Sequence, residues 1–310
     1  MSLGSVRTVL LLSDKSSGST ALQAELLRHP EVRAVGYTMH NDHETLFWVK
    51  AAALVWPHRE DFAGGRRPLS RRAARRDLRA LLAGNVPNWS PPERATPEAD
   101  RALVWDGWRA LSGAHGPVFF EKSPHHLHHW AATALLLRAA LASPREVRVV
   151  GLVRNPMAVL YSAWTRWLTP PGPRQHVWLR TARNLLAVQA ALGPDRVRLW
   201  RYEDLVTRPA EEVRAMTDWL GLAPEAAVGS GLHARSARRW AADPEFSLAL
   251  DPAVAAVAER LGYAPADLHN PPKPGRPLAG RVADAAARRV RTARGALSRR
   301  VVRPLRDRRA

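Results

Sequence analysis

The stretch that most constrains the fold is residues 10–26, which reads LLLSDKSSGSTALQAEL. Val9–Leu12 is an apolar run of strand length, residues 13–20 are small and polar, and apolar residues recur at helical spacing from Ala21. A loop that leads from a strand into a helix presents backbone N–H groups and the positive end of the helix dipole to an anion. The stretch predicts a strand–loop–helix unit that either binds a phosphate-type anion or simply caps the helix.

The loop carries a hydroxyl group or a charge at almost every position. Lys15 supplies positive charge, Gly18 permits close approach of the backbone, and the hydroxyl donors are Ser16, Ser17, Ser19 and Thr20. In the G-x-x-x-x-G-K-[ST] loop of nucleoside triphosphatases the Lys follows the last Gly, whereas here Lys15 precedes Gly18. The pattern therefore does not indicate a nucleoside triphosphatase.

Four further apolar runs predict strands, and helical patterns follow most of them. The runs are Val32–Tyr37, Val118–Phe120, Val147–Val153 and Val197–Tyr202. The order strand–loop–helix recurs along the chain, and it predicts an α/β fold with a mainly parallel sheet. We expect a P-loop-like, three-layer fold with a central sheet of about five strands flanked by helices.

Residues 57–117 are the least regular part of the chain. They predict a helix at Ser70–Ala83 and a second at Thr96–Leu111, with Thr96 as N-cap. The exposed sides of the first helix are expected to carry Arg71, Arg72, Arg75, Arg76 and Arg79. This region either shapes a ligand pocket or is an insertion with solvated Arg side chains.

Polar residues gather where the predicted strands end, which is the edge of an open parallel sheet that binds ligands. Residues 38–48 (TMHNDHETLFW) contribute His40, Asp42, His43 and Glu44. The same run also fits a helix start with Asn41 or Asp42 as N-cap and Glu44 in the first turn.

Two more strand ends carry candidate residues. Glu121-Lys122-Ser123-Pro124 follows the third strand and brings a charged pair with a hydroxyl. Arg154 follows the fourth strand, and Ser162 lies eight residues later on a helix that Asn155 is expected to cap. An Arg fork together with a helix hydroxyl suits a phosphate group.

Composition limits the other chemistry. The sequence has no Cys, which excludes disulfides and thiolate nucleophiles. His125, His126, His128 and His129 are spaced unlike the ligands of a tetrahedral metal site, and no carboxylate lies between them. No apolar run approaches about 18 residues, and the N-terminal run resembles a core strand more than a signal peptide. We expect a cytoplasmic enzyme without a metal.

The formal net charge of +19 favours anionic partners. Residues 273–310 hold thirteen Lys or Arg and two Asp, a net of +11, which leaves +8 for the other 272 residues. Apolar residues recur every three or four positions in this tail, with Arg between them. The pattern is typical of a basic amphipathic helix that lies on anionic membranes or binds a partner, and it equally fits a solvated helix.

Several separated segments together resemble the superfamily of sulfotransferases that use 3′-phosphoadenosine 5′-phosphosulfate (PAPS), and its bacterial and carbohydrate-type branch in particular. The segments are Lys15–Thr20, Glu121–Pro124, Arg154–Ser162, Tyr202–Leu205, Trp219–Leu222 and Arg238–Trp240. The resemblance covers roughly residues 6–263. We therefore expect a sulfotransferase domain at 1–270, with 57–117 as a variable acceptor-side insertion and 271–310 as the basic tail.

The resemblance implies in-line transfer of a sulfuryl group from PAPS to a hydroxyl or amine of a small-molecule or carbohydrate acceptor, with no catalytic metal. Residues 44–48 (ETLFW) are similar to the segment that holds the catalytic Glu of heparan-type members. Glu44 is therefore expected to be the general base, with His40 and His43 as alternatives. Lys15 and Lys122 would stabilise charge on the sulfuryl and bridging oxygens.

The resemblance also implies the donor contacts. The 5′-phosphosulfate would be bound by Lys15, Ser16, Ser17, Gly18, Ser19 and Thr20. Arg154 and Ser162 would hold the 3′-phosphate, Arg238 or Arg239 would add to that site, and Tyr202 would line the adenine pocket. The loop departs from the family's pattern at one point, since Ser16 stands where the family carries Lys or Arg and Lys15 lies one position earlier.

Two other classes share part of this pattern. A mononucleotide-dependent small-molecule kinase of the P-loop-like α/β class would use the same strand–loop–helix unit. A nucleic-acid-binding protein would explain the charge, but the sequence contains no nucleic-acid recognition motif.

Overall fold

The computed structural model describes residues 7–40, 43–58, 69–92, 95–143, 146–234 and 237–272. Asn41, Asp42 and residues 273–310 of the predicted basic tail lie outside these residues. The chain divides into two compact units, Met1–Arg154 with Val177–Ala234 and Asn155–His176 with Arg235–Ala310. The sheet belongs to the first unit.

The sheet confirms the predicted α/β fold. Its strands are β1 (Arg7–Ser13), β2 (Val32–Arg33), β3 (Val118–Lys122), β4 (Val147–Val153) and β5 (Val197–Arg201). They lie in the order β2-β3-β1-β4-β5, and every neighbouring pair is parallel. The central strand β1 therefore lies between β3 and β4, both of which follow it in the chain.

The edge strand β2 is shorter than the predicted Val32–Tyr37. The Asn85 side chain accepts a hydrogen bond from the N–H of Tyr37 (3.0 Å) and donates one to its carbonyl oxygen (2.7 Å). These bonds satisfy the backbone of Tyr37 without a strand partner. The sheet pairing therefore ends at Arg33, and residues 34–40 form a loop.

The strand register sets up the ligand edge. Leu11 of β1 pairs with Lys122 of β3, and Ser13 pairs with Leu152 of β4. Lys122, Ser13 and the residue that follows β4, Arg154, consequently stand at the same carboxyl edge. Strands β2 and β3 lie on one side of β1, and β4 and β5 lie on the other, so the strand order reverses at β1. This is the topological position where open α/β sheets bind ligands.

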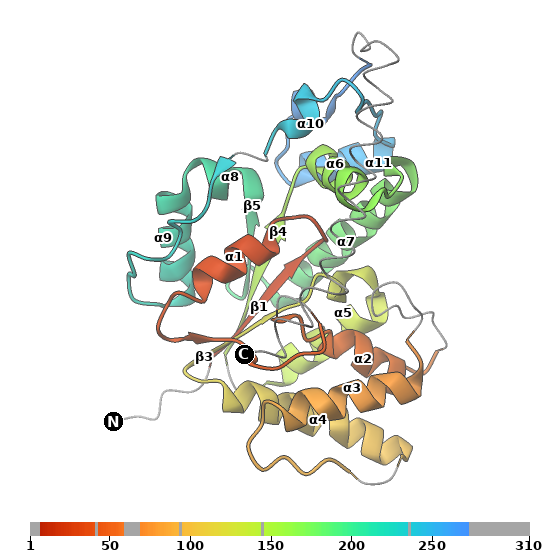
Figure 1. Cartoon of the computed structure of the whole chain (residues 1–310), viewed down its shortest axis with the longest axis vertical. Helices are drawn as coiled ribbons and strands as arrows, with labels where there is room; N and C mark the ends of the chain where they lie inside the picture. Colours follow the sequence, from red (N-terminus) through yellow and green to blue (C-terminus); the bar gives the residue numbers. More distant parts are fainter. Residues whose placement is uncertain are drawn as a thin grey trace, which may run out of the picture. The chain divides into compact units, whose positions relative to one another are not determined.

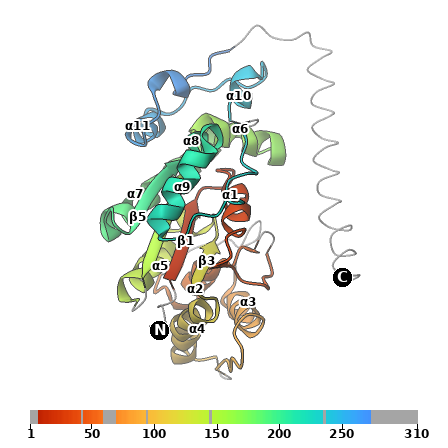
Figure 2. The same cartoon turned by 90° about the vertical axis from the view of Figure 1, so that its left-hand side faces the viewer.

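Helices cover both faces of the sheet (Figures 1 and 2), with α1 (Ser19–Leu26) and α9 (Pro209–Leu220) on one side and α5 (Trp130–Ala142) and α7 (Pro171–Leu192) on the other. Successive residues of β5 reach opposite faces. Trp200 packs against Trp219 of α9, with ring centroids 5.4 Å apart. On the other face, a Cβ at Gly151 would collide with Leu199 and crowd Leu185 of α7, so Gly151 allows α7 to approach.

The region predicted as an insertion forms α3 (Arg71–Ala83) and α4 (Pro97–Ala114), which pack on α2 (Phe47–Val55). The predicted N-cap Thr96 is confirmed, since it accepts from the N–H of Ala99, and Ser70, predicted as the first residue of its helix, is instead the N-cap and accepts from the N–H of Ala73. An aromatic core joins α2, α4 and β3, and it consists of Phe47, Trp48, Trp105, Trp108 and Phe119.

The prediction that all five Arg side chains of α3 are exposed is wrong. Arg75 is partly buried and holds Asp100 of α4 with two hydrogen bonds of 2.7 Å. Asp100 is buried and also accepts from Arg71 at 3.3 Å. A buried carboxylate requires such partners, and this requirement draws Arg75 inward. Arg79 is likewise partly buried.

The second unit is helical in its described part, with α6 (Pro156–Trp167), α10 (Arg239–Ala242), α11 (Pro252–Arg260) and the 3₁₀ helix η4 (Pro265–Leu268). Asn155 caps α6 as predicted, because its side chain accepts from the N–H of Met157 at 2.8 Å. Met157, Leu160, Trp240 and Phe246 form its core. Within the described ranges, no helix combines the length and apolarity needed to cross a membrane.

The pairing of α3 with α4 through Asp100 generates a stability prediction. We expect Asp100→Asn to lower the free energy of unfolding by about 1.5–3 kcal/mol, because a buried charge-assisted network loses its charge. The matched control is Asp106→Asn on the same helix, since Asp106 forms an exposed ion pair with Arg109 and should cost at most about 0.5 kcal/mol. Urea unfolding measures both, and equal effects would contradict the burial of Asp100.

Candidate active site

The loop between β1 and α1 is folded back on itself around Asp14. The Asp14 carboxylate accepts the N–H of Lys15 at 2.7 Å and lies 3.1 Å from Nε2 of His128. The N–H of Ser17 donates to the Asp14 carbonyl oxygen at 3.3 Å, and Ser16 adopts a left-handed backbone conformation (φ 69°). The loop leads directly into the N-terminus of α1, where the first N–H groups have no acceptor within the helix.

Three of the predicted donor-binding positions meet at this loop. Gly18 has φ 92°, and a Cβ at this position would collide with the ring of Tyr202, the first residue of α8 (Tyr202–Thr207). The Arg154 guanidinium lies over the Tyr202 ring, 4.5 Å from the ring centroid. Arg154 also donates to the carbonyl oxygen of Ser16 at 2.8 Å. The ends of β1, β4 and β5 thus converge on one loop.

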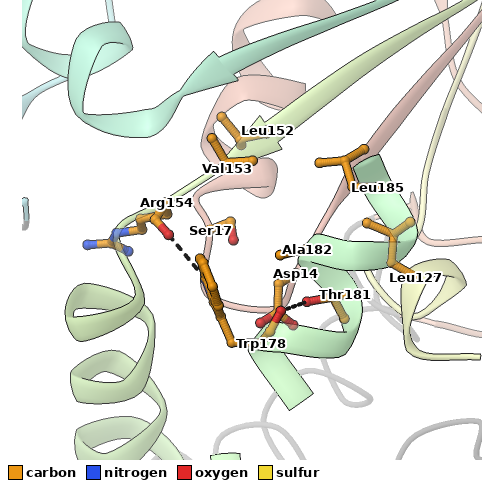
Figure 3. A pocket seen from close by; sticks show the side chains of 10 residues that line it. All are labelled: Asp14, Ser17, Leu127, Leu152, Val153, Arg154, Trp178, Thr181, Ala182 and Leu185. Atoms are coloured by element: carbon orange, nitrogen blue, oxygen red, sulfur yellow. Dashed lines mark hydrogen bonds between the residues drawn. The ribbon is translucent and has the colours of Figure 1, made fainter. Parts of the chain in front are cut away.

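Helix α7 supports the loop from behind (Figure 3). Trp178 Nε1 donates to the carbonyl oxygen of Arg154 at 3.2 Å, and Thr181 donates to the carbonyl oxygen of Trp178 at 2.9 Å. Together with Asp14 and Ser17 these side chains line a small pocket beneath the loop. The sequence analysis missed Trp178 and Thr181, because no local motif marks a helix residue that supports a distant loop.

Beside the loop, the structure brings together three predicted residues from three segments. Lys122 is fully buried at the end of β3, and its Nζ lies 2.9 Å from Oε1 of Glu44 and 3.3 Å from the hydroxyl of Thr20. The Glu44 side chain is 17% exposed. A carboxylate, a buried ammonium group and the first turn of α1 therefore meet where the loop opens.

Glu44 lies in a loop and not in the first turn of a helix, and the alternative N-caps Asn41 and Asp42 lie outside the described residues. Helix α2 begins at Phe47, after Leu46 in a left-handed conformation (φ 48°). The Thr38 hydroxyl donates to the Glu44 carbonyl oxygen at 2.6 Å. His43 has φ 55°, and its Nδ1 lies 2.9 Å from the carbonyl oxygen of Val35.

A buried polar network lies next to Glu44. Thr45 and Ser123 both donate to Oε1 of Glu121, at 2.6 Å and 2.7 Å. All three residues are almost fully buried. The sequence analysis singled out Glu121 and Ser123 as part of a strand-end motif, but it did not connect them with Thr45.

Burial keeps the nearby imidazoles neutral. It lowers the pKa of His40 from 6.5 to about 4, with a further contribution from the positive charge of Lys50. It lowers the pKa of His125 to about 2, with Lys15 as the next cause. Burial also lowers the pKa of Lys50 from 10.5 to about 8. In the described part of the chain, no group of three or more His, Cys, Asp or Glu residues is arranged to hold a metal ion.

The remaining predicted donor residues belong to the second unit. Ser162 lies on α6 and is partly buried. Arg238 forms an ion pair with Asp267 at 2.7 Å, whereas Arg239 is exposed at the start of α10. The shared phosphate site of Arg154 and Ser162 stays a prediction.

The packing of Tyr202 on Gly18 gives a prediction with an internal control. Gly193 also has a positive φ (80°), but a Cβ there would meet open space. Gly193→Ala should therefore cost only the backbone strain, about 1 kcal/mol. Gly18→Ala should cost about 1–3 kcal/mol more, because the Tyr202 ring must move. Urea unfolding measures the difference, and equal losses would show that the ring does not rest on Gly18.

Comparisons with known proteins identify the family and the fold of the chain. The model of a family described as the sulfotransferase family matches residues 9–225. Among solved structures, the sulfotransferase domain from the Synechococcus PCC 7002 olefin synthase is 22% identical, with a TM-score of 0.56 over 84% of this chain and 96% of that one. The sulfotransferase domain from the curacin biosynthetic pathway is 18% identical, with a TM-score of 0.53 over 84% of this chain and 98% of that one.

These two structural likenesses show a shared fold. No curated protein matches the chain. The family match covers more than half of the sequence and selects the sulfotransferase interpretation over the kinase and the nucleic-acid-binding protein. The chain therefore belongs to the sulfotransferase family.

Proposed function

We propose that this protein transfers a sulfuryl group from PAPS to a hydroxyl or amine of a small-molecule or carbohydrate acceptor. The observation that carries the proposal is the meeting of Glu44, Lys122 and Thr20 beside the loop 14–18. Membership of the sulfotransferase family supports the transfer of a sulfuryl group. The donor and the acceptor class are the proposed part.

The loop has the properties that a phosphosulfate requires. The hydroxyl oxygens of Ser13 and Ser16 are buried and have no hydrogen-bond partner among the described residues. A buried hydroxyl without a partner costs free energy, and an anion held in the loop would supply the missing acceptor. The N-terminus of α1 adds N–H donors and a favourable dipole. These residues fit the 5′-phosphosulfate of PAPS.

Glu44 and Lys122 have different roles in the proposed transfer. PAPS supplies an activated sulfuryl group: a bond forms from the acceptor oxygen or nitrogen to sulfur, the bond from sulfur to the bridging oxygen breaks, and its electron pair stays on the 5′-phosphate of the product. Glu44 takes the proton that the acceptor loses. Lys122 favours the ionised form of Glu44 and stabilises negative charge near Thr20, with greater effect because it is buried.

The 3′-phosphate and the adenine need further contacts. We assign the 3′-phosphate to Arg154, whose guanidinium carries the charge at the end of β4, and the adenine pocket to Tyr202. Lys15 adds positive charge to the loop, although it stands one position before the family's basic residue. Ser162 and Arg239, which the family resemblance also implies for the 3′-phosphate, stay predictions.

Calorimetric titration of 3′-phosphoadenosine 5′-phosphate tests the donor site. We expect micromolar binding to the wild type and a loss of about 10–100-fold in Arg154→Ala, because a charge-assisted phosphate contact is removed. Adenosine 5′-phosphate should bind more weakly than the 3′-phosphorylated compound to the wild type and lose less in the variant. Arg196→Ala is the control, since Arg196 donates to the carbonyl oxygens of Ala140 and Val147.

The titration separates two roles of Arg154. If both nucleotides lost the same affinity in Arg154→Ala, Arg154 would only support the loop through its bond to Ser16. If the folded wild type bound neither nucleotide, the proposed donor would be wrong.

Transfer rates test the general base. With labelled PAPS and a panel of sugars, phenols, aliphatic alcohols and amines, we expect Glu44→Gln to reduce kcat by about 10²–10⁴-fold, because the amide cannot accept the proton. Binding of 3′-phosphoadenosine 5′-phosphate should stay within a few-fold of the wild type. His40→Gln is the comparison, and it should keep most of the activity. The opposite ranking of the two variants would assign the proton to His40.

A further inference from the structure

We propose that Thr45, Ser123 and Glu121, with His126, position Glu44 for proton transfer by holding the backbone of the residues that follow it. This inference rests on the proposed function, because it assigns these residues a purpose in the same reaction. Each of them is a positioning residue and does not itself touch the reacting groups.

The start of α2 shows why such support is needed. Its N-cap is Leu46, which has no polar side chain to accept the N–H groups of the first turn and adopts a left-handed conformation. For a residue other than Gly this conformation is strained and persists only when its surroundings impose it. Glu44 lies two residues before this point, so its position depends on what holds Leu46.

Side chains accept the N–H groups of three consecutive residues at this helix start. The N–H of Leu46 donates to the Ser123 hydroxyl at 3.0 Å, and that of Phe47 donates to the Thr45 hydroxyl at 3.1 Å. The N–H of Trp48 donates to Nε2 of His126 at 3.3 Å. The start of α2 is thus capped by Thr45 beside it, by Ser123 just after β3 and by His126 of the 3₁₀ helix η2 (His126–His128).

All of these acceptors converge on the Glu121 carboxylate. The hydroxyls of Thr45 and Ser123 both donate to its Oε1. Burial lowers the pKa of His126 and keeps its ring neutral. Because Nε2 accepts from Trp48, the ring proton is on Nδ1, which lies 3.6 Å from Oε2 of Glu121. One carboxylate therefore orients the two hydroxyl caps by hydrogen bonds, and its second oxygen faces the His126 ring beyond hydrogen-bond distance.

The alternation of strand β3 connects this network with the reactive pair. Lys122 projects to the opposite face from Glu121 and Ser123. Lys122 contacts Glu44, while Glu121 contacts Thr45, so two adjacent residues of the loop are matched to two adjacent residues of the strand. A second bond to Thr45, from Nζ of Lys50 to its carbonyl oxygen at 2.8 Å, fixes the loop further.

The test removes one hydroxyl group. Thr45→Val keeps the shape of the side chain but loses its donor and acceptor, and we expect kcat to fall at least about tenfold. The KM for the acceptor that gives the highest turnover in the panel, and the affinity for 3′-phosphoadenosine 5′-phosphate, should change less than about threefold. Thr45→Ser restores the hydroxyl and should recover most of kcat. Thr217→Val is the matched control, because Thr217 is a buried Thr of α9 whose hydroxyl bonds only to backbone oxygens of its own helix.

Hydrogen exchange provides a readout that does not depend on activity. In Thr45→Val and in Ser123→Ala, the amides of residues 46–48 should exchange at least about tenfold faster, whereas they should be unchanged in Thr217→Val. If these amides stayed protected, the network would not hold the loop. If they lost protection while kcat stayed at the wild-type value, the network would be structural only.

The inference and the proposed function fail in different ways. A wild-type chain that transfers no sulfuryl group would overturn the proposed function and, with it, the catalytic purpose of the network, even where exchange still showed the loop to be held. An active wild type with an equally active Thr45→Val would overturn the inference alone.

Discussion

The buried ammonium group of Lys122 is the constraint on which the active-site edge depends. A fully buried cation is stable only with close partners, and Lys122 has them in the Glu44 carboxylate and the Thr20 hydroxyl. These partners come from a loop before α2 and from the first turn of α1. The parallel pairing of β1 with β3 brings α1 beside Lys122. The arrangement of the sheet and the placement of the candidate base are therefore linked through one side chain.

The loop 14–18 obtains its shape from its surroundings as much as from its own composition. Asp14 binds the backbone at the start of the loop, while Arg154 binds the carbonyl oxygen of Ser16, where the backbone is left-handed. Tyr202 closes the far side against Gly18. In the family's pattern the basic residue stands at the place of Ser16. Here the carbonyl oxygen of Ser16 accepts a hydrogen bond from Arg154. A positively charged side chain therefore lies near the loop, although Lys15 is displaced by one position.

Local signals explain which parts of the fold could be predicted from the sequence. The β-branched run Val147–Val153 forms β4 with the predicted bounds, and the helix caps Thr96 and Asn155 act as expected, because a cap needs only its own helix. Tertiary contacts explain the errors. The polar run before Glu44 resembles a helix start, but the caps that position α2 come from Ser123 and His126, more than seventy residues later. Asp100 draws Arg75 inward in the same way.

Glu121 at the end of β3 and Glu44 in the loop before α2 place the same functional group in two different environments. Glu121 is almost fully buried and its Oε1 already accepts two hydroxyl hydrogen bonds, so an acceptor molecule has no access to it. Glu44 is 17% exposed and lies 2.9 Å from the ammonium group of Lys122, so it has a charged partner and stays accessible. A proton acceptor must reach its substrate, whereas a positioning group must be shielded from it. Accessibility therefore favours Glu44 over Glu121 as the proposed proton acceptor, and burial suits Glu121 to the proposed positioning role.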